Sequence, residues 1–303
     1  MTDNILTGVD LGGTKISAVV MEASGRELAR IRVASPRNDY AATLAAIADI
    51  VNEAERAAGL GPDTANRPFG IGTPGSTIPS SGLIQNANSL WLNGKPLWAD
   101  LERVTDRRVI MANDANCLAL SESFDGAAAG EQTVFAVILG TGVGGGLVID
   151  GKLLNGPLGI SGEWGHNPLP WPQKSEWPGP ICWCGRYGCL ETWLSGPGLS
   201  ADHQRQTGDS LAADVIASAA TRACVETMQR YRDRLSRAIA GVVNIIDPNV
   251  VVLGGGLSRI SGLAEELPEL ILPHVFSDAP SIRIVRAMHG DDSGVRGAAR
   301  LCA

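Results

Sequence analysis

The sequence predicts an α/β protein of two domains, and three observations lead to this prediction. Apolar, strand-like segments alternate with segments of helical periodicity along the whole chain. Two strand–glycine turn–strand units, which begin near residues 5 and 133, are similar to one another and indicate an internal duplication. The length of 303 residues is about twice the roughly 150 residues that one domain typically holds.

The elements follow one another in a regular order. A helix is expected at residues 40–58, because Leu44, Ile47 and Val51 recur at helical spacing before a glycine. Strands are expected at residues 5–9, 16–21, 28–33, 69–72, 108–111, 133–139, 147–149, 250–253 and 282–285, and further helices at 97–104, near 223–246 and from 293 onwards. Residues 155–200 are rich in Gly, Pro, Trp and Cys without periodicity, so we expect a loop region there that something other than an apolar core holds together.

Composition and charge exclude several classes of protein. The chain is 44% hydrophobic and 19% charged, which is too apolar for a disordered protein. Its 25 Lys and Arg against 32 Asp and Glu give a formal charge of −7, which argues against nucleic acid or an anionic membrane as a partner. No apolar run approaches the roughly 20 residues of a membrane-spanning helix, and the first residues do not resemble a signal peptide. We therefore expect a cytoplasmic protein.

The DLGGTK turn between the first two predicted strands is suited to binding phosphate. Gly12 and Gly13 allow backbone N–H groups to approach an anion closely. Thr14 and Lys15 add a hydroxyl group and a positive charge, and Asp10 can hold a hydrated Mg²⁺ that accompanies the phosphates. The alternative is a tight hairpin whose glycines have positive φ, and for a single turn of this kind that alternative is favoured.

Two further glycine turns also follow apolar strands. The turn at residues 140–146 matches G-x-G-x-x-G, but the strand expected at 147–149 replaces the helix that a dinucleotide site requires. The third turn is at residues 254–256, after the strand expected at 250–253. Three such turns in one chain favour binding of a nucleotide triphosphate, with the third turn near the adenine or ribose. The expected nucleotide contacts in the second and third turns are Gly140, Thr141, Gly142, Gly254, Gly255 and Gly256.

A group of metal-ligating side chains lies in the aperiodic region. Cys182, Cys184 and Cys189 follow His166, and one imidazole with three thiolates completes a closed tetrahedral Zn²⁺ shell. Such a metal is structural, because it orders a segment too rich in Gly and Pro to order itself. The alternative is that three free thiols lie in a buried loop.

Four polar residues are candidates for chemistry. Asp114 and Asn113 follow a predicted strand, at the end where ligands usually bind in α/β proteins. Asp114 is suited to accept a proton from a substrate hydroxyl, but an Asp before a helix also serves as an N-cap, and both roles stay open. Glu163 and Glu191 flank the proposed zinc and suit a polyhydroxylated ligand, although isolated acidic residues are equally consistent with a solvated surface.

These residues resemble the ROK family of bacterial sugar kinases, within the sugar kinase/actin/Hsp70-type ATPase superfamily. The resemblance covers essentially the whole chain, and its most specific motif is the histidine with CxCGxxGCxE. The matching motifs are residues 10–15 (DLGGTK), 73–75 (TPG), 112–117 (ANDANC), 140–146, 162–166 (GEWGH), 182–191 (CWCGRYGCLE) and 254–256.

The resemblance implies a fold of two duplicated ribonuclease H-like units with a cleft between the domains. The smaller α/β domain would cover residues 1–112, rejoined by the C-terminal helix at 291–303. The larger domain would cover residues 113–290, include the zinc-binding region at 155–200, and commonly form a homodimer.

The resemblance also implies a role for each site residue, with ATP, Mg²⁺ and structural Zn²⁺ as cofactors. Asp114 would be the general base for the 6-hydroxyl of a hexose. The glycine turns would hold ATP, and His166 would face the sugar with one ring nitrogen and zinc with the other. The residues implied to line the sugar site are Gly75, Asn88, Asn113, Asp114, Glu163, His166 and Glu191.

Within the family, residues 86–94 and 165–171 look most like bacterial fructokinases, so we expect the conversion of D-fructose to fructose 6-phosphate. The alternatives are an N-acetylglucosamine kinase, a glucokinase or, less favoured, a non-catalytic sugar sensor. A DNA-binding repressor is not expected, because the first predicted strand begins by Ile5 and leaves no room for a helix-turn-helix.

Overall fold

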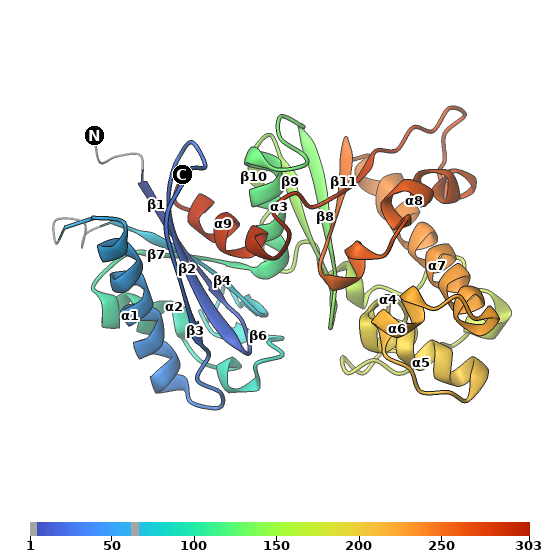
Figure 1. Cartoon of the computed structure of the whole chain (residues 1–303), viewed down its shortest axis with the longest axis horizontal. Coiled ribbons are helices and arrows are strands. Elements are labelled where there is room, and N and C mark those ends of the chain that lie inside the picture. The colour runs from blue at the N-terminus through green and yellow to red at the C-terminus, as the bar shows by residue number, and fades with distance from the viewer. Residues whose placement is uncertain (1–4, 62–66) are drawn as a thin grey trace. The chain divides into compact units, whose positions relative to one another are not determined.

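The computed structural model describes residues 5–61 and 67–303, which form two five-stranded sheets with flanking helices (Figure 1). The first sheet has the order β3-β2-β1-β4-β7 and the second the order β10-β9-β8-β11-β12. The strands of the first sheet are β1 (Ile5–Leu11), β2 (Lys15–Glu22), β3 (Glu27–Ala34), β4 (Phe69–Thr73) and β7 (Val109–Asn113). Those of the second are β8 (Thr133–Leu139), β9 (Val143–Ile149), β10 (Lys152–Leu153), β11 (Val250–Gly254) and β12 (Ile284–Arg286).

The two sheets repeat one topology. In each, an antiparallel hairpin (β1–β2 or β8–β9) is followed by two strands that are parallel to the first strand of the hairpin. A third, two-stranded sheet joins β5 (Ser76–Thr77) to β6 (Ile84–Gln85). The α/β class and the internal duplication are therefore confirmed.

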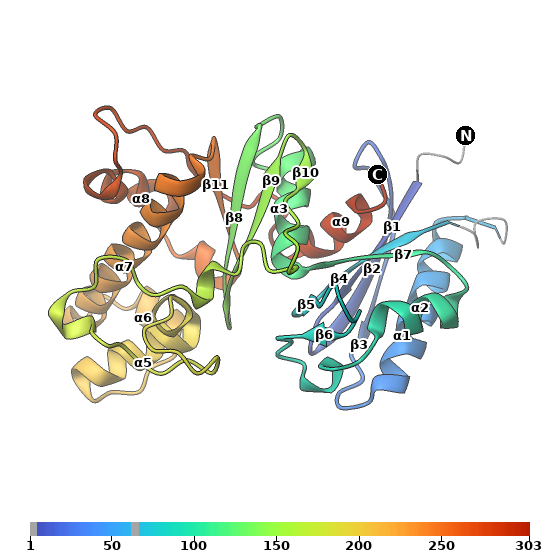
Figure 2. The same cartoon turned by 180° about the vertical axis from the view of Figure 1, so that it is seen from behind.

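Helices flank both sheets (Figures 1 and 2), and most of them connect one strand to the next along the chain. The α-helices are α1 (Tyr40–Ala57), α2 (Leu97–Thr105), α3 (Asp114–Asp125), α4 (Glu191–Leu194), α5 (Gly196–Thr207), α6 (Ala213–Ser218), α7 (Arg222–Ile246), α8 (Leu263–Ile271) and α9 (Ser293–Arg300). The short 3₁₀ helices are η2 (Leu90–Leu92), η3 (Trp164–His166), η4 (Lys174–Glu176), η5 (Gly256–Arg259), η6 (Leu272–His274) and η7 (Gly290–Asp292). Among residues 5–61 and 67–303, no helix is both long enough and apolar enough to span a bilayer.

Both faces of the first sheet are buried. Successive side chains of a strand point to opposite faces, so neighbouring residues pack in different clusters. On β2, Val20 packs in the cluster that contains Leu44 and Ile47 of α1, whereas Met21 packs with Val295 of α9. Helix α9 approaches very closely: a Cβ added at Gly70 of β4 would lie 1.7 Å from the carbonyl oxygen of Ala298. The sequence of β4 therefore requires glycine for the contact with the final helix.

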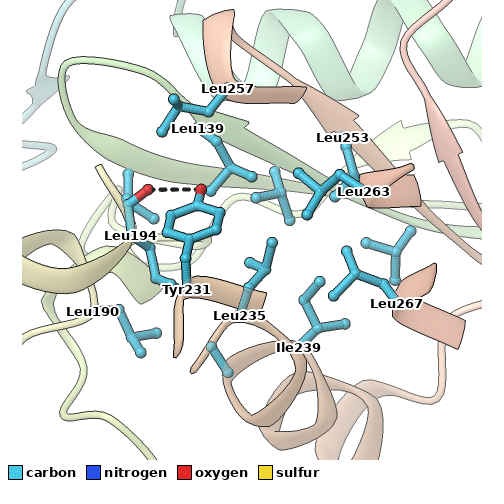
Figure 3. Close-up of a cluster of buried hydrophobic side chains, with 14 of the residues drawn as sticks. Leu139, Leu190, Leu194, Tyr231, Leu235, Ile239, Leu253, Leu257, Leu263 and Leu267 are labelled. Atoms are coloured by element: carbon cyan, nitrogen blue, oxygen red, sulfur yellow. Dashed lines mark hydrogen bonds between the residues drawn. The ribbon is translucent and has the colours of Figure 1, made fainter. Parts of the chain in front are cut away.

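The core of the second sheet is built mainly against α7 (Figure 3). Leu235 and Ile239 of this helix pack with Leu253 of β11 and with side chains of α8. Tyr231 is fully buried, and its hydroxyl donates to the backbone oxygen of Leu194 at 3.0 Å. This hydrogen bond satisfies the buried phenol and ties α7 to the end of α4.

The chain forms two compact units. Unit 1 comprises Met1–Ala129, Gly151–Ser161 and Asp291–Ala303, and unit 2 comprises Gly130–Asp150 and Gly162–Gly290. Residues 113–129, expected with the larger domain, cluster with unit 1 because α3 packs on α9, where a Cβ at Gly297 would lie 1.8 Å from the Cys117 oxygen.

Two local expectations differ from the structure. Only residues 140–142 form the second glycine turn, because Val143 already belongs to β9. Gly145 lies within that strand and is needed for space, since a Cβ there would be 2.9 Å from the ring of Trp164. The aperiodic region at 155–200 also contains α4 and the start of α5, which the sequence pattern did not indicate.

Buried charges anchor this region to α7. Glu176 of η4 accepts hydrogen bonds from Arg234 at 2.8 Å and from Arg237 at 2.9 Å, both on α7. Burial opposes the ionised carboxylate, but these two guanidinium groups hold the pKa of Glu176 below its usual value. The loop is thus attached to the helix by a charge-assisted network.

Candidate functional site

The first glycine turn closes the β1–β2 hairpin of unit 1. The Gly12 N–H donates to the Lys15 oxygen at 3.0 Å, and Gly13, Thr14 and Lys15 are exposed. Neither Gly12 nor Gly13 has a positive φ, so the alternative of a hairpin that needs glycine for left-handed backbone does not apply. Glycine is needed at residue 12 for space, because a Cβ there would lie 2.9 Å from the Lys15 oxygen. The turn therefore presents backbone and a lysine to solvent, as a phosphate site requires.

Asp10 lies near the end of β1, just before this turn, and is half-buried. Burial, followed by the negative charge of Asp114, raises the pKa of Asp10 to about 6, against the opposing effects of Lys15 and Arg32. Gly294 of α9 also lies against this side chain, since a Cβ at that glycine would be 3.3 Å from the carboxyl carbon. A carboxylate that is costly to ionise beside a second carboxylate suits a site for a divalent cation.

Asn113 and Asp114 join β7 to α3, and the structure separates their roles. Asn113 is the N-cap, because its side-chain oxygen accepts the Asn116 N–H at 2.8 Å. Its amide nitrogen remains as a donor. Asp114 is therefore not the N-cap: it is the first helical residue, and one of its oxygens accepts the Ala115 N–H at 2.8 Å.

Asp114 is exposed to solvent, yet the protein atoms around it raise its pKa by desolvation, with the Ala115 hydrogen bond opposing the rise. An accessible carboxylate with a raised pKa is a chemically suitable proton acceptor for an alcohol.

Gly75 and Asn88 lie on two segments of unit 1 that touch. Gly75 has φ of 74°, and a Cβ there would be 2.3 Å from the Gln85 oxygen and 2.7 Å from the Ala87 nitrogen. Asn93 holds the second segment, because its side chain bonds both the N–H and the oxygen of Ala87 at 2.9 Å. Asn88 follows directly and is exposed, so its amide is presented by a fixed loop.

Unit 2 brings the second and third glycine turns side by side. Gly140 directly follows β8, and its N–H donates to the Gly142 oxygen at 3.0 Å. Gly254 pairs with Ile138 of β8, and a Cβ at Gly255 would lie 2.4 Å from the Leu139 oxygen. Gly255, with φ of 80°, thus lets the 254–256 turn pack against the end of the strand that carries the 140–142 turn.

Glu191 connects the 140–142 turn to the cysteine loop. Its Oε2 accepts the Val143 N–H at 3.0 Å, and a Cβ at Gly142 would lie 2.7 Å from this oxygen. Its Oε1 accepts the indole N–H of Trp183 at 2.6 Å. The carboxylate is therefore oriented at both oxygens rather than solvated at the surface.

The candidate metal ligands converge in unit 2. One ligand atom from each of His166, Cys182, Cys184 and Cys189 lies within 4.8 Å of all the others. Nδ1 of His166 is 3.6 Å from the Cys182 sulfur, and the Cys184 and Cys189 sulfurs are also 3.6 Å apart. Ligand bonds of about 2.0 to 2.3 Å to a tetrahedral Zn²⁺ require separations of this size. The donor set fits a closed zinc site.

Each thiol must lose its proton to bind a metal, and its surroundings make this costly for Cys189. Burial and the neighbouring Cys184 and Cys182 raise the pKa of Cys189 to about 12, because crowded thiols resist ionisation. The other three cysteines are separate: Cys117 and Cys224 are buried in helices, and Cys302 is half-buried.

Glu163 and His166 lie at the two ends of η3. The His166 N–H donates to the Glu163 oxygen at 3.4 Å, and Trp164 between them is anchored by its indole, which donates to the Gly144 oxygen at 2.8 Å. Both side chains are half-buried. With Nδ1 directed at the cysteines, Nε2 of His166 is the ring nitrogen left for a ligand.

Each predicted site residue therefore belongs to one of two groups, one in each unit. Unit 1 gathers the first turn, Asp10, Gly75, Asn88, Asn113 and Asp114. Unit 2 gathers the second and third turns, the four metal ligands, Glu163 and Glu191. Two residues of the site were missed by sequence reasoning. Trp183 lies between two cysteines that drew attention instead. Ser89, whose Oγ would be 3.4 Å from a Cβ at Gly13, belongs to the 86–94 segment, but nothing in its spacing connects it to the first glycine turn.

Comparison with known proteins gives consistent matches over almost the whole chain. The model of the ROK family matches residues 6–303. N-acetyl-D-glucosamine kinase of Escherichia coli O6:H1 is 41% identical over 305 residues, which cover 97% of this chain and 98% of that protein. N-acetyl-D-glucosamine kinase of Salmonella typhimurium (strain LT2) is 38% identical over 301 residues, with the same coverage of both proteins.

Solved structures agree with this result. The ROK hexokinase of Thermus thermophilus superimposes with a TM-score of 0.86 and 32% identity, covering 98% of this chain and 97% of that one. A ROK family glucokinase of Streptomyces griseus, solved in complex with glucose and AMPPNP, gives a TM-score of 0.76 and 27% identity, covering 98% of both chains.

Proposed function

The chain belongs to the ROK family of sugar kinases, and from this premise we propose that it transfers the γ-phosphoryl group of ATP to the 6-hydroxyl of a hexose. The observation that carries the proposal is the pair Asp10 and Asp114. One carboxylate lies in a phosphate-type turn, and the other is accessible at the end of β7, close enough to raise the pKa of Asp10.

Asp114 is the proposed general base. Its raised pKa brings it closer to the pKa of the attacking alcohol, which favours proton acceptance as the oxygen attacks phosphorus. The hydroxyl proton passes to the carboxylate while the new O–P bond forms and the bond to ADP breaks. Most of the rate enhancement in phosphoryl transfer comes from positioning and charge stabilisation, which the remaining residues are proposed to supply.

The glycine turns are proposed to hold the nucleotide. Lys15 and the exposed backbone of its turn, with the 140–142 turn, would contact phosphates, and the 254–256 turn would approach the adenosine. Mg²⁺, held at Asp10, would neutralise phosphate charge.

Several polar side chains are proposed to contact the sugar hydroxyls. Unit 1 would contribute the amides of Asn88 and Asn113, with Gly75 keeping the Asn88 loop in place. Unit 2 would contribute Glu163, Glu191 and Nε2 of His166. The Cys₃His site is proposed to bind a structural Zn²⁺, because its donor set fits and it orders the loop that carries these groups.

The comparisons favour one substrate over the one expected from the sequence. Relatives at 38% and 41% identity are N-acetyl-D-glucosamine kinases, so N-acetyl-D-glucosamine is the first proposed hexose. Fructose, expected from residues 86–94 and 165–171, is not specifically supported by these relatives. It remains the second candidate because of the resemblance of these two segments to fructokinases. The homodimer and the cytoplasmic location remain predictions.

The test is an assay of ADP release with purified protein and ATP–Mg²⁺. The sugars are N-acetyl-D-glucosamine, fructose, mannose, glucose and N-acetylmannosamine, and phosphorus NMR of the product assigns the phosphorylated hydroxyl. We expect phosphorylation at the 6-hydroxyl with the highest kcat/KM for N-acetyl-D-glucosamine. Sugar-independent ADP release only, or no release with any hexose, would contradict the proposal.

A further inference from the structure

Trp183 lies at an unusual place for a large aromatic residue. Its two chain neighbours, Cys182 and Cys184, both belong to the candidate metal cluster, so its backbone is held on both sides. Its side chain is nevertheless 65% exposed. The residue thus combines a fixed backbone with an indole that is open to a ligand.

This one indole contacts two of the proposed sugar ligands. Its N–H donates to Oε1 of Glu191 at 2.6 Å. Its ring meets the His166 ring edge to face, with centroids 4.9 Å apart and planes at 88°. Because Oε2 of Glu191 is held by the Val143 N–H, the indole completes the orientation of that carboxylate.

A glutamate at the start of a helix otherwise has several rotamers, and ordering it on sugar binding would cost conformational entropy. The Trp183 hydrogen bond selects the rotamer before the sugar arrives. The ring also offers an exposed apolar surface beside two polar groups, which matches the mixed C–H and hydroxyl surface of a pyranose or furanose.

We propose that Trp183 is a positioning residue for the sugar: its N–H orients Glu191, and its ring packs against His166 and contacts the hexose. The inference rests on the proposed function for the role of Glu191 and His166. The inference goes beyond the proposed function because it assigns a part of the sugar affinity to a residue between two candidate metal ligands. Trp183 touches no transferred group, so its effect falls on sugar binding rather than on the chemical step.

The test compares W183F with W177F in the zinc-loaded protein. Trp183→Phe keeps an aromatic ring and removes the N–H, whereas Trp177 is 73% exposed in the same loop region and serves as the matched control. The measurements are kcat, the KM for sugar and for ATP, the sugar Kd by calorimetry without ATP, and the zinc content.

For W183F we expect the sugar KM and Kd to rise about 3- to 10-fold, the range for one lost hydrogen bond. The value of kcat should stay within about twofold, and the KM for ATP and the zinc content should stay unchanged. Trp183→Ala should raise the sugar Kd further, because the ring is lost as well. W177F should behave as the wild type.

A sugar Kd for W183F equal to that of W177F would overturn the inference, and so would a loss of zinc that accounts for the weaker binding. A different result would contradict the proposed function. If the wild type binds a hexose without phosphorylating it, the kinase proposal is wrong while the Kd comparison still decides the role of Trp183. If it binds no hexose, both are wrong.

Discussion

The negative charge of Asp114 raises the pKa of Asp10, although the two residues are far apart in the sequence. Residue 10 is the second-last residue of β1, and residue 114 begins α3 directly after β7. The parallel strands β1, β4 and β7 bring these ends to one edge of the sheet. The two carboxylates repel one another, and a bound cation would relieve the repulsion. This repulsion lowers the stability of the cation-free protein and thereby favours binding of a cation.

Asp10→Asn is therefore expected to stabilise the protein at neutral pH while abolishing its activity. The folded-state pKa of Asp10, about 6, lies above the unfolded value of about 3.9, so folding favours the protonated form. The stability contributed by this group is present below about pH 4 and is lost as the pH rises through 6. In Mg²⁺-free buffer the variant should gain on the order of 1–3 kcal/mol at pH 7.5 and nothing near pH 4.

Melting temperatures across this pH range measure the effect, and Asp125→Asn supplies a control of opposite sign. Burial opposes ionisation of Asp125, but Arg296 and Arg300 hold its pKa below the usual value. That carboxylate contributes stability above its unfolded pKa, which is lost as the pH falls, so its replacement should lower the melting temperature at pH 7.5. A melting temperature of D10N below that of the wild type at pH 7.5 would refute the assignment.

Asp114→Asn should reduce kcat by about 10²- to 10⁴-fold, the usual contribution of a positioned general base. The amide oxygen can still accept the Ala115 N–H, so the start of α3 should stay intact. Steady-state kinetics measure the loss, and calorimetry with an ATP analogue should show nucleotide affinity close to that of the wild type. Turnover at the wild-type rate would exclude Asp114 as the base.

Cys184→Ala should lose bound zinc and order in the 155–200 region, because three ligands no longer close the shell. Metal analysis, melting temperature and limited proteolysis in this region are the measurements. Cys302→Ala is the matched control, since Cys302 is half-buried outside the cluster and should keep the full zinc content. Zinc retained at wild-type stoichiometry in the Cys184 variant would require a different ligand set.

Gly70→Ala should destabilise unit 1 by about 3 kcal/mol, through overpacking against a backbone that has no room to move. The added Cβ would fall 1.7 Å from the Ala298 oxygen, whereas at Gly61 a Cβ meets nothing within 4 Å. Thermal unfolding of the two variants measures the difference, and Gly61→Ala should stay within about 0.5 kcal/mol of the wild type. Equal stability of the two variants would mean that α9 does not pack on β4 in this way.

Much of the fold could be predicted from the sequence because its signals are local. The strand at 133–139 was placed at its true ends, and helix α1 within one residue, since apolar periodicity and flanking glycines act over a few residues. The start of β9 at Val143 was missed, because glycines in a strand resemble a turn when the neighbour that requires them, Trp164, is out of view.

For the candidate site, too, the sequence predicts some features and only the tertiary structure decides others. The sequence by itself determined the chemical groups: the carboxylates at strand ends, the glycine turns, and the four candidate metal ligands within a short stretch of chain. Only the tertiary structure decided which of Asn113 and Asp114 caps α3, and that Glu191 is held between Val143 and Trp183. The physical reason is that spacing along the chain constrains backbone conformation. The direction of a side chain, its desolvation and its long-range partners depend on packing between segments that the sequence does not place next to one another.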